Sequence, residues 1–465
     1  MDSAIMNPGE TGTSGIYLVV FIAYIVLVLG FTFISKRISD ADGFWTENRS
    51  VSGLRAGISL SATFMSISWS VVYGIEVFLQ YGLGGFFVLS LPWIIVLSVF
   101  LWLAPRLRNI PVFSQPELIS GKFGKSAGKL AAIPILLVFI IWAGAEMDVA
   151  ASLLAGTMGM SQPLLLFIIA TVIAIYMSFS GTNAVIVTDV IQYILVALFF
   201  IIILYAGFSS RPVNPIVLKL DFHRIQPLFI MLTFIAYLPG WLAETDIWIR
   251  LQITRNGREA RKAMGISLVN AVLFVFLMPM LVAAFLPAGM TSGTKGVAWL
   301  LARIHHPFFV ALAAVGLIAA SMSTIDTCIN VAAMTLSFDL TKKRTLSRNI
   351  AAVWLTAALA FLFGIYSNSL KDAFYLSSGI LSTTLFLPVL ACYLPVGKKT
   401  GVVSVLALAP VLTIVFYAFE KYGWFAIPGA NGISYILISF GAALLLFFGG
   451  SALEPAGPKL STDRD

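Results

Sequence analysis

Residues 59–70 read Ser-Leu-Ser-Ala-Thr-Phe-Met-Ser-Ile-Ser-Trp-Ser and lie inside an apolar stretch, 53–81, that is long enough to cross a membrane as a helix. Hydroxyl side chains compete with the helix for backbone hydrogen bonds, so such a dense run predicts an interrupted helix. A second apolar stretch, 228–251, contains Tyr-Leu-Pro-Gly-Trp at 237–241. Proline removes a backbone donor and glycine loosens the turn, so we expect a break at Pro239 and Gly240. Both breaks would expose backbone carbonyls.

The composition identifies the class of protein around these two stretches. Hydrophobic residues make up 59% of the 465-residue chain and charged residues only 11%, whereas soluble proteins carry about 25% charge. We therefore expect an all-α integral membrane protein with about 13 transmembrane helices of roughly 20 residues each. The expected spans are 15–35, 53–81, 83–104, 127–158, 162–181, 184–207, 228–251, 262–287, 307–338, 349–367, 373–394, 401–419 and 431–450.

The two interrupted spans stand five spans apart, which predicts an internal repeat. Residues 53–207 and 228–395 would form two five-helix repeats of opposite orientation, the arrangement that builds a binding site at the membrane midplane in many transporters. The span 15–35 is then an extra amino-terminal helix and 401–450 two additional carboxy-terminal helices, so 1–465 is a single transporter domain. The alternative is that Pro and Gly are simply common in membrane helices.

Basic residues predict how the bundle is oriented. With thirteen spans and the amino terminus outside, most of the 29 Lys and Arg residues fall in loops on the cytoplasmic side, as the positive-inside rule requires. The carboxy terminus is then cytoplasmic, and we expect a multi-pass protein of the plasma membrane, or inner membrane, of the cell. The net charge of +8 reflects this topology. The lipid bilayer is therefore an expected partner and nucleic acid is not.

Carboxylates inside the predicted spans indicate transport. An ionisable group at that depth costs at least about 2.5 kcal/mol unless it is paired, and we expect no Lys or Arg there to pair with it. A metal ion, protons or a cationic solute would then supply the positive charge. Asp246 has a simpler alternative, an ion pair with Arg250 one helical turn later, and Glu76 has another, exposure near the outer surface. The carboxylates are Glu76, Glu146, Asp148, Asp189, Glu244, Asp246 and Asp326.

The ninth span carries a row of oxygen-bearing side chains. Ala320, Ser323, Thr324 and Thr327 are three or four residues apart and share one helix face. A small hard cation prefers such oxygen ligands in a compact cage, and carbonyls freed by the broken second span would complete it. The alternative is that these hydroxyls bond to their own helix.

Three motifs resemble a known family. Ala-Ser-Met-Ser-Thr-Ile-Asp-Thr at 320–327, with Ser-Phe-Asp at 337–339, resembles the ninth helix of the sodium/solute symporter family. Residues 180–192 are similar to its G-G-x-x-A-V-x-x-T-D-x-x-Q pattern, with Ser180 in place of the first glycine. Trp-Ile-Arg-Leu-Gln at 248–252 with Arg-Glu-Ala at 258–260 is the third match. The resemblance covers residues 15–450.

The resemblance implies a LeuT-type core of five plus five helices and sodium-driven uptake by alternating access. Sodium is then the coupling ion, and no other cofactor is expected. A second sodium ion or a shared proton would be held by Asp189, Asp326 and Thr327, because two close carboxylates do not readily both ionise. The sodium ligands it implies are the carbonyls of Ala62, Met65 and Ala320 and the hydroxyls of Ser323 and Thr324.

The substrate is expected to bind between the two breaks. Aromatic faces with nearby carboxylates attract organic ammonium groups through cation–π interactions worth about 0.5 to 2 kcal/mol each. A cationic or amine-bearing small solute is therefore favoured. A neutral or anionic solute such as an amino acid, vitamin or sugar is the alternative, since a Glu can also bond hydroxyl or amide groups. The expected substrate-binding residues are Trp69, Tyr73, Trp142, Glu146, Trp241 and Glu244.

Other classes of function find less support. The three histidines fall in expected outer loops, and neither a G-x-S-x-G motif nor a phosphate-binding glycine loop is present, so we expect no enzyme. A transporter-like sensor would normally carry a signalling domain, and the loops are too short for one. Proton coupling at Asp189 or Asp326 is the closer alternative to sodium. The sequence leaves the oligomeric state open, and a monomer is the working expectation.

Overall fold

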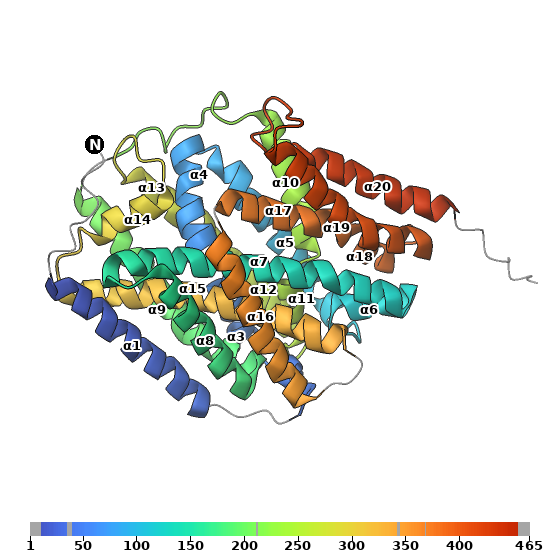
Figure 1. Cartoon of the computed structure of the whole chain (residues 1–465), viewed down its shortest axis with the longest axis horizontal. Coiled ribbons are helices and arrows are strands. Elements are labelled where there is room, and N and C mark those ends of the chain that lie inside the picture. Colours follow the sequence, from blue (N-terminus) through green and yellow to red (C-terminus); the bar gives the residue numbers. More distant parts are fainter. Residues whose placement is uncertain (1–10, 35–39, 211–212, 342–344, 368, 454–465) are drawn as a thin grey trace, which may run out of the picture.

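The structure is a computed structural model that describes residues 11–34, 40–210, 213–341, 345–367 and 369–453. Within these ranges the chain forms helices joined by loops (Figure 1). Residue 35, the expected end of the first span, lies outside the described residues. The all-α membrane fold is confirmed.

Each expected span corresponds to one helix or to consecutive helical segments. Among the described residues, eleven helices are long and apolar enough to cross a membrane, or twelve when one bent pair is counted as a span. The first helix has a shorter apolar section, Tyr17–Thr32, so thirteen is an approximate count. The segments of the first half are α1 Thr11–Ile34, α2 Gly43–Thr46, η1 Glu47–Arg49, α3 Gly53–Phe64, η2 Ile67–Tyr73, α4 Gly74–Tyr81, η3 Phe86–Ser90, α5 Leu91–Arg108, α6 Gln115–Phe123, α7 Lys125–Met158, α8 Gln162–Ser180 and α9 Thr182–Ser210.

The second half continues in the same way. Its segments are α10 Pro227–Leu242, α11 Thr245–Gln252, α12 Gly257–Ala271, η4 Val272–Leu277, α13 Met278–Ala284, α14 Gly293–Leu301, α15 Pro307–Met334, η5 Thr335–Asp339, α16 Leu346–Tyr366, α17 Leu370–Thr384, α18 Phe386–Tyr393, α19 Lys399–Lys421 and α20 Tyr435–Leu453.

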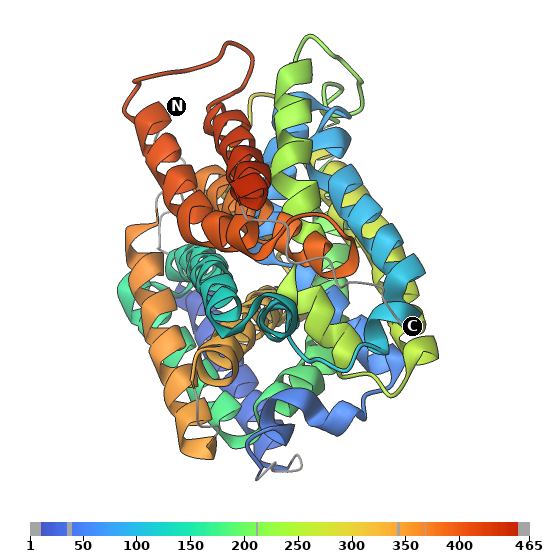
Figure 2. The same cartoon turned by 90° about the vertical axis from the view of Figure 1, so that its right-hand side faces the viewer.

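The long helices α7 and α15 lie at the centre of the bundle. They pack against each other, and α15 also packs along α9. Helix α1 lies on one side of the molecule, while α19 and α20 lie together on the opposite side (Figures 1 and 2). Because α15 is buried along most of its length, its hydroxyl-bearing face meets protein rather than lipid.

The second span is broken where the hydroxyl-rich run predicts. Helix α3 ends at Phe64, and the chain resumes as the π-helical segment η2 after a bend of 56°. Ser66 is extended at the break (φ −68°, ψ 144°), and its hydroxyl accepts a hydrogen bond from the amide of Trp69 over 2.9 Å. The serine therefore caps the half of the span that follows.

The seventh span is broken at a different place from the one expected. Helix α10 continues through Pro239 and Gly240 and ends at Leu242. The interruption falls at Ala243 and Glu244, where Glu244 is extended (φ −71°, ψ 126°), and α11 begins at Thr245. The prediction of a break at Pro239 and Gly240 is therefore wrong by about one helical turn.

A hydrogen bond from helix α17 explains why α10 stays helical across its proline. The ring nitrogen of Pro239 cannot donate to the carbonyl of Ile235, and the hydroxyl of Ser382 on α17 donates to that carbonyl instead, over 2.6 Å. Gly240 lets the two helices approach, because a Cβ atom there would lie 2.8 Å from the carbonyl oxygen of Ser378. The hydrogen bond lost within α10 is replaced by one from its neighbour.

Candidate functional site

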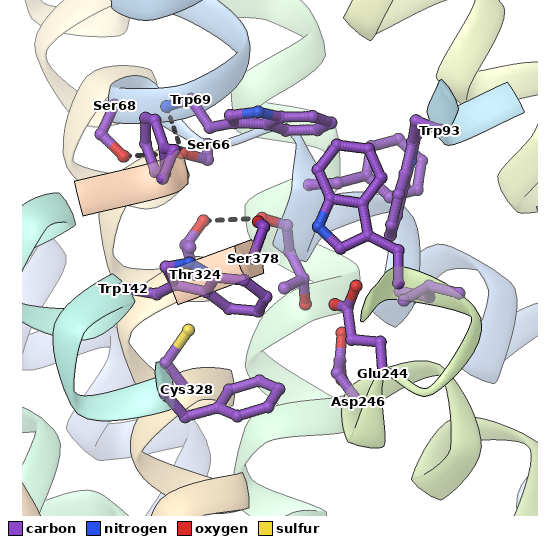
Figure 3. Close-up of a pocket in the computed structure, with 16 residues that line it drawn as sticks. Ser66, Ser68, Trp69, Trp93, Trp142, Glu244, Asp246, Thr324, Cys328 and Ser378 are labelled. Carbon is purple, nitrogen blue, oxygen red and sulfur yellow. Dashed lines mark hydrogen bonds between the residues drawn. The ribbon is translucent and has the colours of Figure 1, made fainter. Parts of the chain in front are cut away.

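A cavity lies where the two broken spans meet α5, α7, α15 and α17 (Figure 3). Its volume is about 80 Å³. This is room for several waters or a very small solute. It is lined by Leu60, Thr63, Phe64, Ser66, Ser68, Trp69, Trp93, Phe139, Trp142, Trp241, Glu244, Asp246, Thr324, Cys328, Phe374 and Ser378.

Three indole rings form one wall of the cavity. Trp69, Trp93 and Trp241 come from three different spans, and their ring centroids are 5.3 to 5.7 Å apart in edge-to-face contacts. Such contacts are the favoured geometry for aromatic pairs. On another wall, the indole nitrogen of Trp142 donates to the hydroxyl of Ser377 over 2.6 Å, which fixes that ring. These contacts therefore hold the aromatic side chains in place without a ligand.

Two carboxylates point into this cavity. Glu244 lies at the break of the seventh span and Asp246 in the first turn of α11, and Figure 3 shows both side chains directed toward the open space. Glu244 is only 6% exposed. Within the described part of the chain, its Oε2 atom has no hydrogen-bond partner. A buried carboxylate without a partner is costly, so this group needs a cation or a proton from outside the protein.

Arg250 overturns the expectation that no basic side chain reaches this depth. It is fully buried on α11, and its guanidinium lies 3.1 Å from the carboxylate of Asp246 and 3.8 Å from that of Asp189. It also donates to the hydroxyls of Thr327, over 2.8 Å, and Ser59, over 3.1 Å. Its side chain extends into the protein, where these oxygens satisfy it. The ion pair with Asp246 is the alternative that the sequence offered for that carboxylate.

Glu146 does not line the cavity, because the second span binds its carboxylate. Oε1 accepts a hydrogen bond from the amide of Ile67 over 2.8 Å, and Oε2 accepts one from the amide of Ser68 over 3.0 Å. The hydroxyls of Ser66, over 2.6 Å, and Ser68 also donate to Oε2. Charge-assisted bonds of this kind are roughly twice as strong as neutral ones. The carboxylate therefore stabilises the start of η2.

The remaining carboxylates that the sequence places in the spans also have partners within the protein. Among the carboxylates named there, Glu244 is the exception. The partners are the amide of Gly293 for Glu76 (3.0 Å), the side chain of Gln162 for Asp148 (2.6 Å), the hydroxyl of Ser59 and Arg250 for Asp189, Arg250 for Asp246, and the hydroxyls of Tyr176 (2.6 Å) and Thr188 (3.5 Å) for Asp326.

Four of the five oxygens expected to bind sodium are linked by hydrogen bonds. The hydroxyl of Ser323 donates to the carbonyl of Ala62 over 3.0 Å and to that of Ala320 over 3.1 Å. The hydroxyl of Thr324 donates to the same Ala320 carbonyl over 3.2 Å. Met65 is buried at the break that follows Ala62, with a non-helical backbone (ψ 40°). The break thus places backbone carbonyls of one span beside the hydroxyls of another.

The residues expected to form a second ion or proton site are divided between two environments. Asp189 and Thr327 both bind Arg250, which already supplies a positive charge. Asp326 binds Tyr176, and in the described residues its Oδ1 atom has no hydrogen-bond partner. Thr327 is also 3.0 Å from the hydroxyl of Thr63. A hydrogen-bonded path therefore runs from Arg250 to the cavity wall.

The structure brings together most of the residues expected to bind substrate. Trp69, Trp142, Trp241 and Glu244 line the cavity. Tyr73 is not among the lining residues, and its ring packs on Phe374 with centroids 5.4 Å apart. Its place in the site stays a prediction.

Sequence reasoning missed several lining residues, among them Trp93, Phe139 and Ser378. One signal could have identified Ser378. It lies in Ser-Ser-Gly-Ile-Leu-Ser-Thr-Thr at 377–384, a hydroxyl-rich run like that at 59–70. Trp93 and Phe139 carry no such signal, because aromatic residues are common throughout membrane helices.

Comparisons with known proteins identify the family and the fold. Residues 44–363 match the sodium:solute symporter family. A substrate-bound, outward-open Na⁺-coupled sialic acid symporter, reported to reveal a novel Na⁺ site, is 18% identical with a TM-score of 0.71, over 95% of this chain and 98% of that one. Mhp1, a nucleobase-cation-symport-1 family transporter in a closed conformation with bromovinylhydantoin bound, is 15% identical with a TM-score of 0.52, over 87% of this chain and 93% of that one. Both likenesses concern the fold.

Proposed function

The chain belongs to the sodium:solute symporter family, and from this premise we propose that it imports a small cationic or amine-bearing solute together with sodium by alternating access. Sodium-coupled solute symport by a multi-pass membrane protein follows from the family. The class of solute, the residues that bind it and the direction of transport are our proposal.

Glu244 carries the proposal for the solute. It is buried in the cavity wall and, among the residues described, lacks a hydrogen-bond partner for Oε2. An ammonium group beside it would supply the missing charge. The neighbouring rings of Trp69, Trp142 and Trp241 would add cation–π attraction of about 0.5 to 2 kcal/mol each. A neutral solute would leave the ionised carboxylate uncompensated, unless Glu244 also took up a proton.

We assign sodium to the carbonyls of Ala62, Met65 and Ala320 and the hydroxyls of Ser323 and Thr324. The contacts of 3.0 to 3.2 Å that link Ser323 and Thr324 to the carbonyls of Ala62 and Ala320 support this assignment. In the bound state the hydroxyls would turn their lone pairs to the ion, since hard cations take oxygen ligands. Thr324 also lines the cavity, so ion and solute would occupy adjoining sites.

We propose that one sodium ion couples transport. Arg250 bonds Thr327 and pairs with Asp189, so at two of the three positions expected to hold a second ion the protein provides its own cation. Asp326 is the position left for a proton, because among the described residues it binds the hydroxyls of Tyr176 and Thr188 rather than a cation. We also propose that the amino terminus is outside and the carboxy terminus cytoplasmic.

Thermal stability of the purified protein tests the proposal. A bound ligand raises the unfolding temperature by mass action, so amines, sugars, vitamins and amino acids are each added with sodium, with potassium or with choline chloride. We expect the largest shift from an amine, and only with sodium. A shift that needs no sodium but depends on pH would overturn sodium coupling in favour of a proton at Asp326. A shift produced by neutral solutes alone would overturn the assignment of Glu244 to a cation.

A further inference from the structure

Both breaks in this fold create a helix that starts inside the membrane. The first such helix begins at Ile67 and the second at Thr245. The amino terminus of a helix attracts anions, because its first amides lack partners within the helix and its dipole is positive there. In transporters built from broken helices, such an end can receive an anionic group of the substrate. What occupies these ends therefore restricts which solutes can bind.

Glu146 occupies the first of them. The amides of Ile67 and Ser68 both donate to its carboxylate, over 2.8 and 3.0 Å. The hydroxyls of Ser66 and Ser68 donate to the same group. The next amide, that of Trp69, donates to the hydroxyl of Ser66. The donors at this end are therefore used within the protein, and a substrate carboxylate would have to displace a buried one.

The second helix start carries carboxylates of its own. Glu244 precedes α11 and Asp246 lies in its first turn, and both line the cavity. They would repel an anion approaching this end of α11. Among the described residues that line the cavity, none is Lys, Arg or His. Arg250, the nearest buried cation, already binds Asp246 and Asp189. The cavity thus has an acceptor for a cation. Toward a carboxylate, its described lining residues offer neutral donors, such as the unpartnered indole N–H of Trp93, but no cation.

We propose that the solute is an amine without a carboxylate, and that Glu146 fills the position that the carboxylate of an amino acid would take. This inference rests on the proposed cation at Glu244 and narrows it. An amino acid would place its own carboxylate among Glu146, Glu244 and Asp246. Its decarboxylated amine keeps the ammonium group for Glu244 and the apolar part for the indole wall.

Pairs of probes in which one partner carries a carboxylate that the other lacks test the inference. Phenethylamine with phenylalanine, isoamylamine with leucine, and choline with glycine betaine are each added to the purified wild-type protein in sodium, and the unfolding temperature is measured. We expect each amine, or choline, to stabilise the protein at concentrations at least about tenfold below its carboxylated partner, because burying an uncompensated charge is costly.

The outcomes separate this inference from the proposed function. If a carboxylated partner stabilises the protein as well as its amine does, the inference is overturned, while an amine-binding sodium symporter remains. If only sugars or other neutral solutes stabilise the protein with sodium, the cation at Glu244 and the inference fall together.

A variant of Glu146 gives a second readout. Glu146→Ala frees the amides of Ile67 and Ser68, so phenylalanine is expected to approach the affinity of phenethylamine. Acetate should restore part of the lost stability by taking the vacated position. Asp148→Ala is the matched control, because Asp148 lies on the same helix and bonds Gln162 instead. If acetate stabilises both variants equally, or phenylalanine gains nothing in a folded Glu146→Ala protein, Glu146 does not hold that position. If Glu146→Ala does not fold, the wild-type pairs decide.

Discussion

The hydroxyl of Thr324 donates a hydrogen bond to the backbone carbonyl of Thr63 over 2.7 Å, and both residues also line the cavity. The ninth span is thereby joined to the broken second span at the edge of the binding space. The same Thr324 hydroxyl lies 3.2 Å from the Ala320 carbonyl of the proposed sodium site. We therefore expect a change in the occupancy of one proposed site to shift residues at the wall of the other.

Removal of one hydroxyl from the proposed sodium site should weaken sodium binding. Ser323→Ala or Thr324→Ala deletes one oxygen ligand, and bonds to charged groups contribute about 1.5 to 3 kcal/mol. We expect the half-saturating sodium concentration for uptake to rise by about tenfold or more. Ser321→Ala is the control, since this buried hydroxyl on the same helix bonds the carbonyl of Leu317, one turn earlier in its own helix. An unchanged sodium response in both variants would contradict the assigned site.

Neutralising Glu244 should remove the preference for cations. Glu244→Gln keeps the shape of the side chain but removes the charge that faces the cavity. We expect affinity for an amine to fall about tenfold or more, while any weak binding of a neutral solute changes little. Asp148→Asn serves as the comparison, because that carboxylate does not line the cavity. Equal losses for charged and neutral solutes would show that Glu244 acts through shape rather than charge.

Loss of Arg250 should destabilise the protein. Arg250→Met leaves the buried carboxylates of Asp189 and Asp246 without their cation, and breaking a buried ion pair costs about 3 to 5 kcal/mol. The unfolding temperature should fall, and a second substitution, Asp189→Asn, should restore part of it. The exposed Arg106, which lies over the ring of Trp102, provides the control substitution Arg106→Met. No difference between the two arginine variants would contradict the role given to Arg250.

The hydrogen bond from Ser382 to Ile235 should be needed only because of Pro239. Ser382→Ala leaves a partly buried carbonyl unpaired, at a cost of about 1 kcal/mol or more. In a Pro239→Ala background the new amide at 239 can bond Ile235 within the helix, so the same serine substitution should cost little. A double-mutant cycle on the free energy of unfolding measures this coupling. Additive effects would mean that the carbonyl is satisfied in another way.

The spans could be predicted because the length and apolarity of a membrane helix are local properties of the sequence. The break near Met65 was also local, since the hydroxyls beside it supply its caps. The break in the seventh span was not. Whether Pro239 interrupts α10 depends on Ser382, which is distant in the sequence and supplies the missing bond. The sequence shows that residue 239 cannot donate a hydrogen bond within the helix, but it does not show that Ser382 supplies one instead.

The candidate site was predictable to a similar degree. Trp241 and Glu244 flank the second break in the sequence, so their place in the cavity follows from the break itself. Glu146 was equally prominent, but its carboxylate turns to the amides of the second span. The position of Arg250 could not be deduced either, because a long side chain near a helix end can extend toward the surface or the interior. Packing between helices decides both cases.

Glu76 links α4 to α14, so these two helices are expected to move together during transport. Its carboxylate accepts the amide of Gly293 at the start of α14, and a Cβ atom at Gly293 would lie 2.0 Å from the carbonyl oxygen of Val72. The short helix therefore sits flush against the half of the second span that follows the break. If this half of the second span tilted without α14, the carboxylate of Glu76 and the amide of Gly293 would lose the hydrogen bond between them. We expect α4 and α14 to rotate as one rigid body, so that a local change at the cavity displaces a loop helix at the membrane surface.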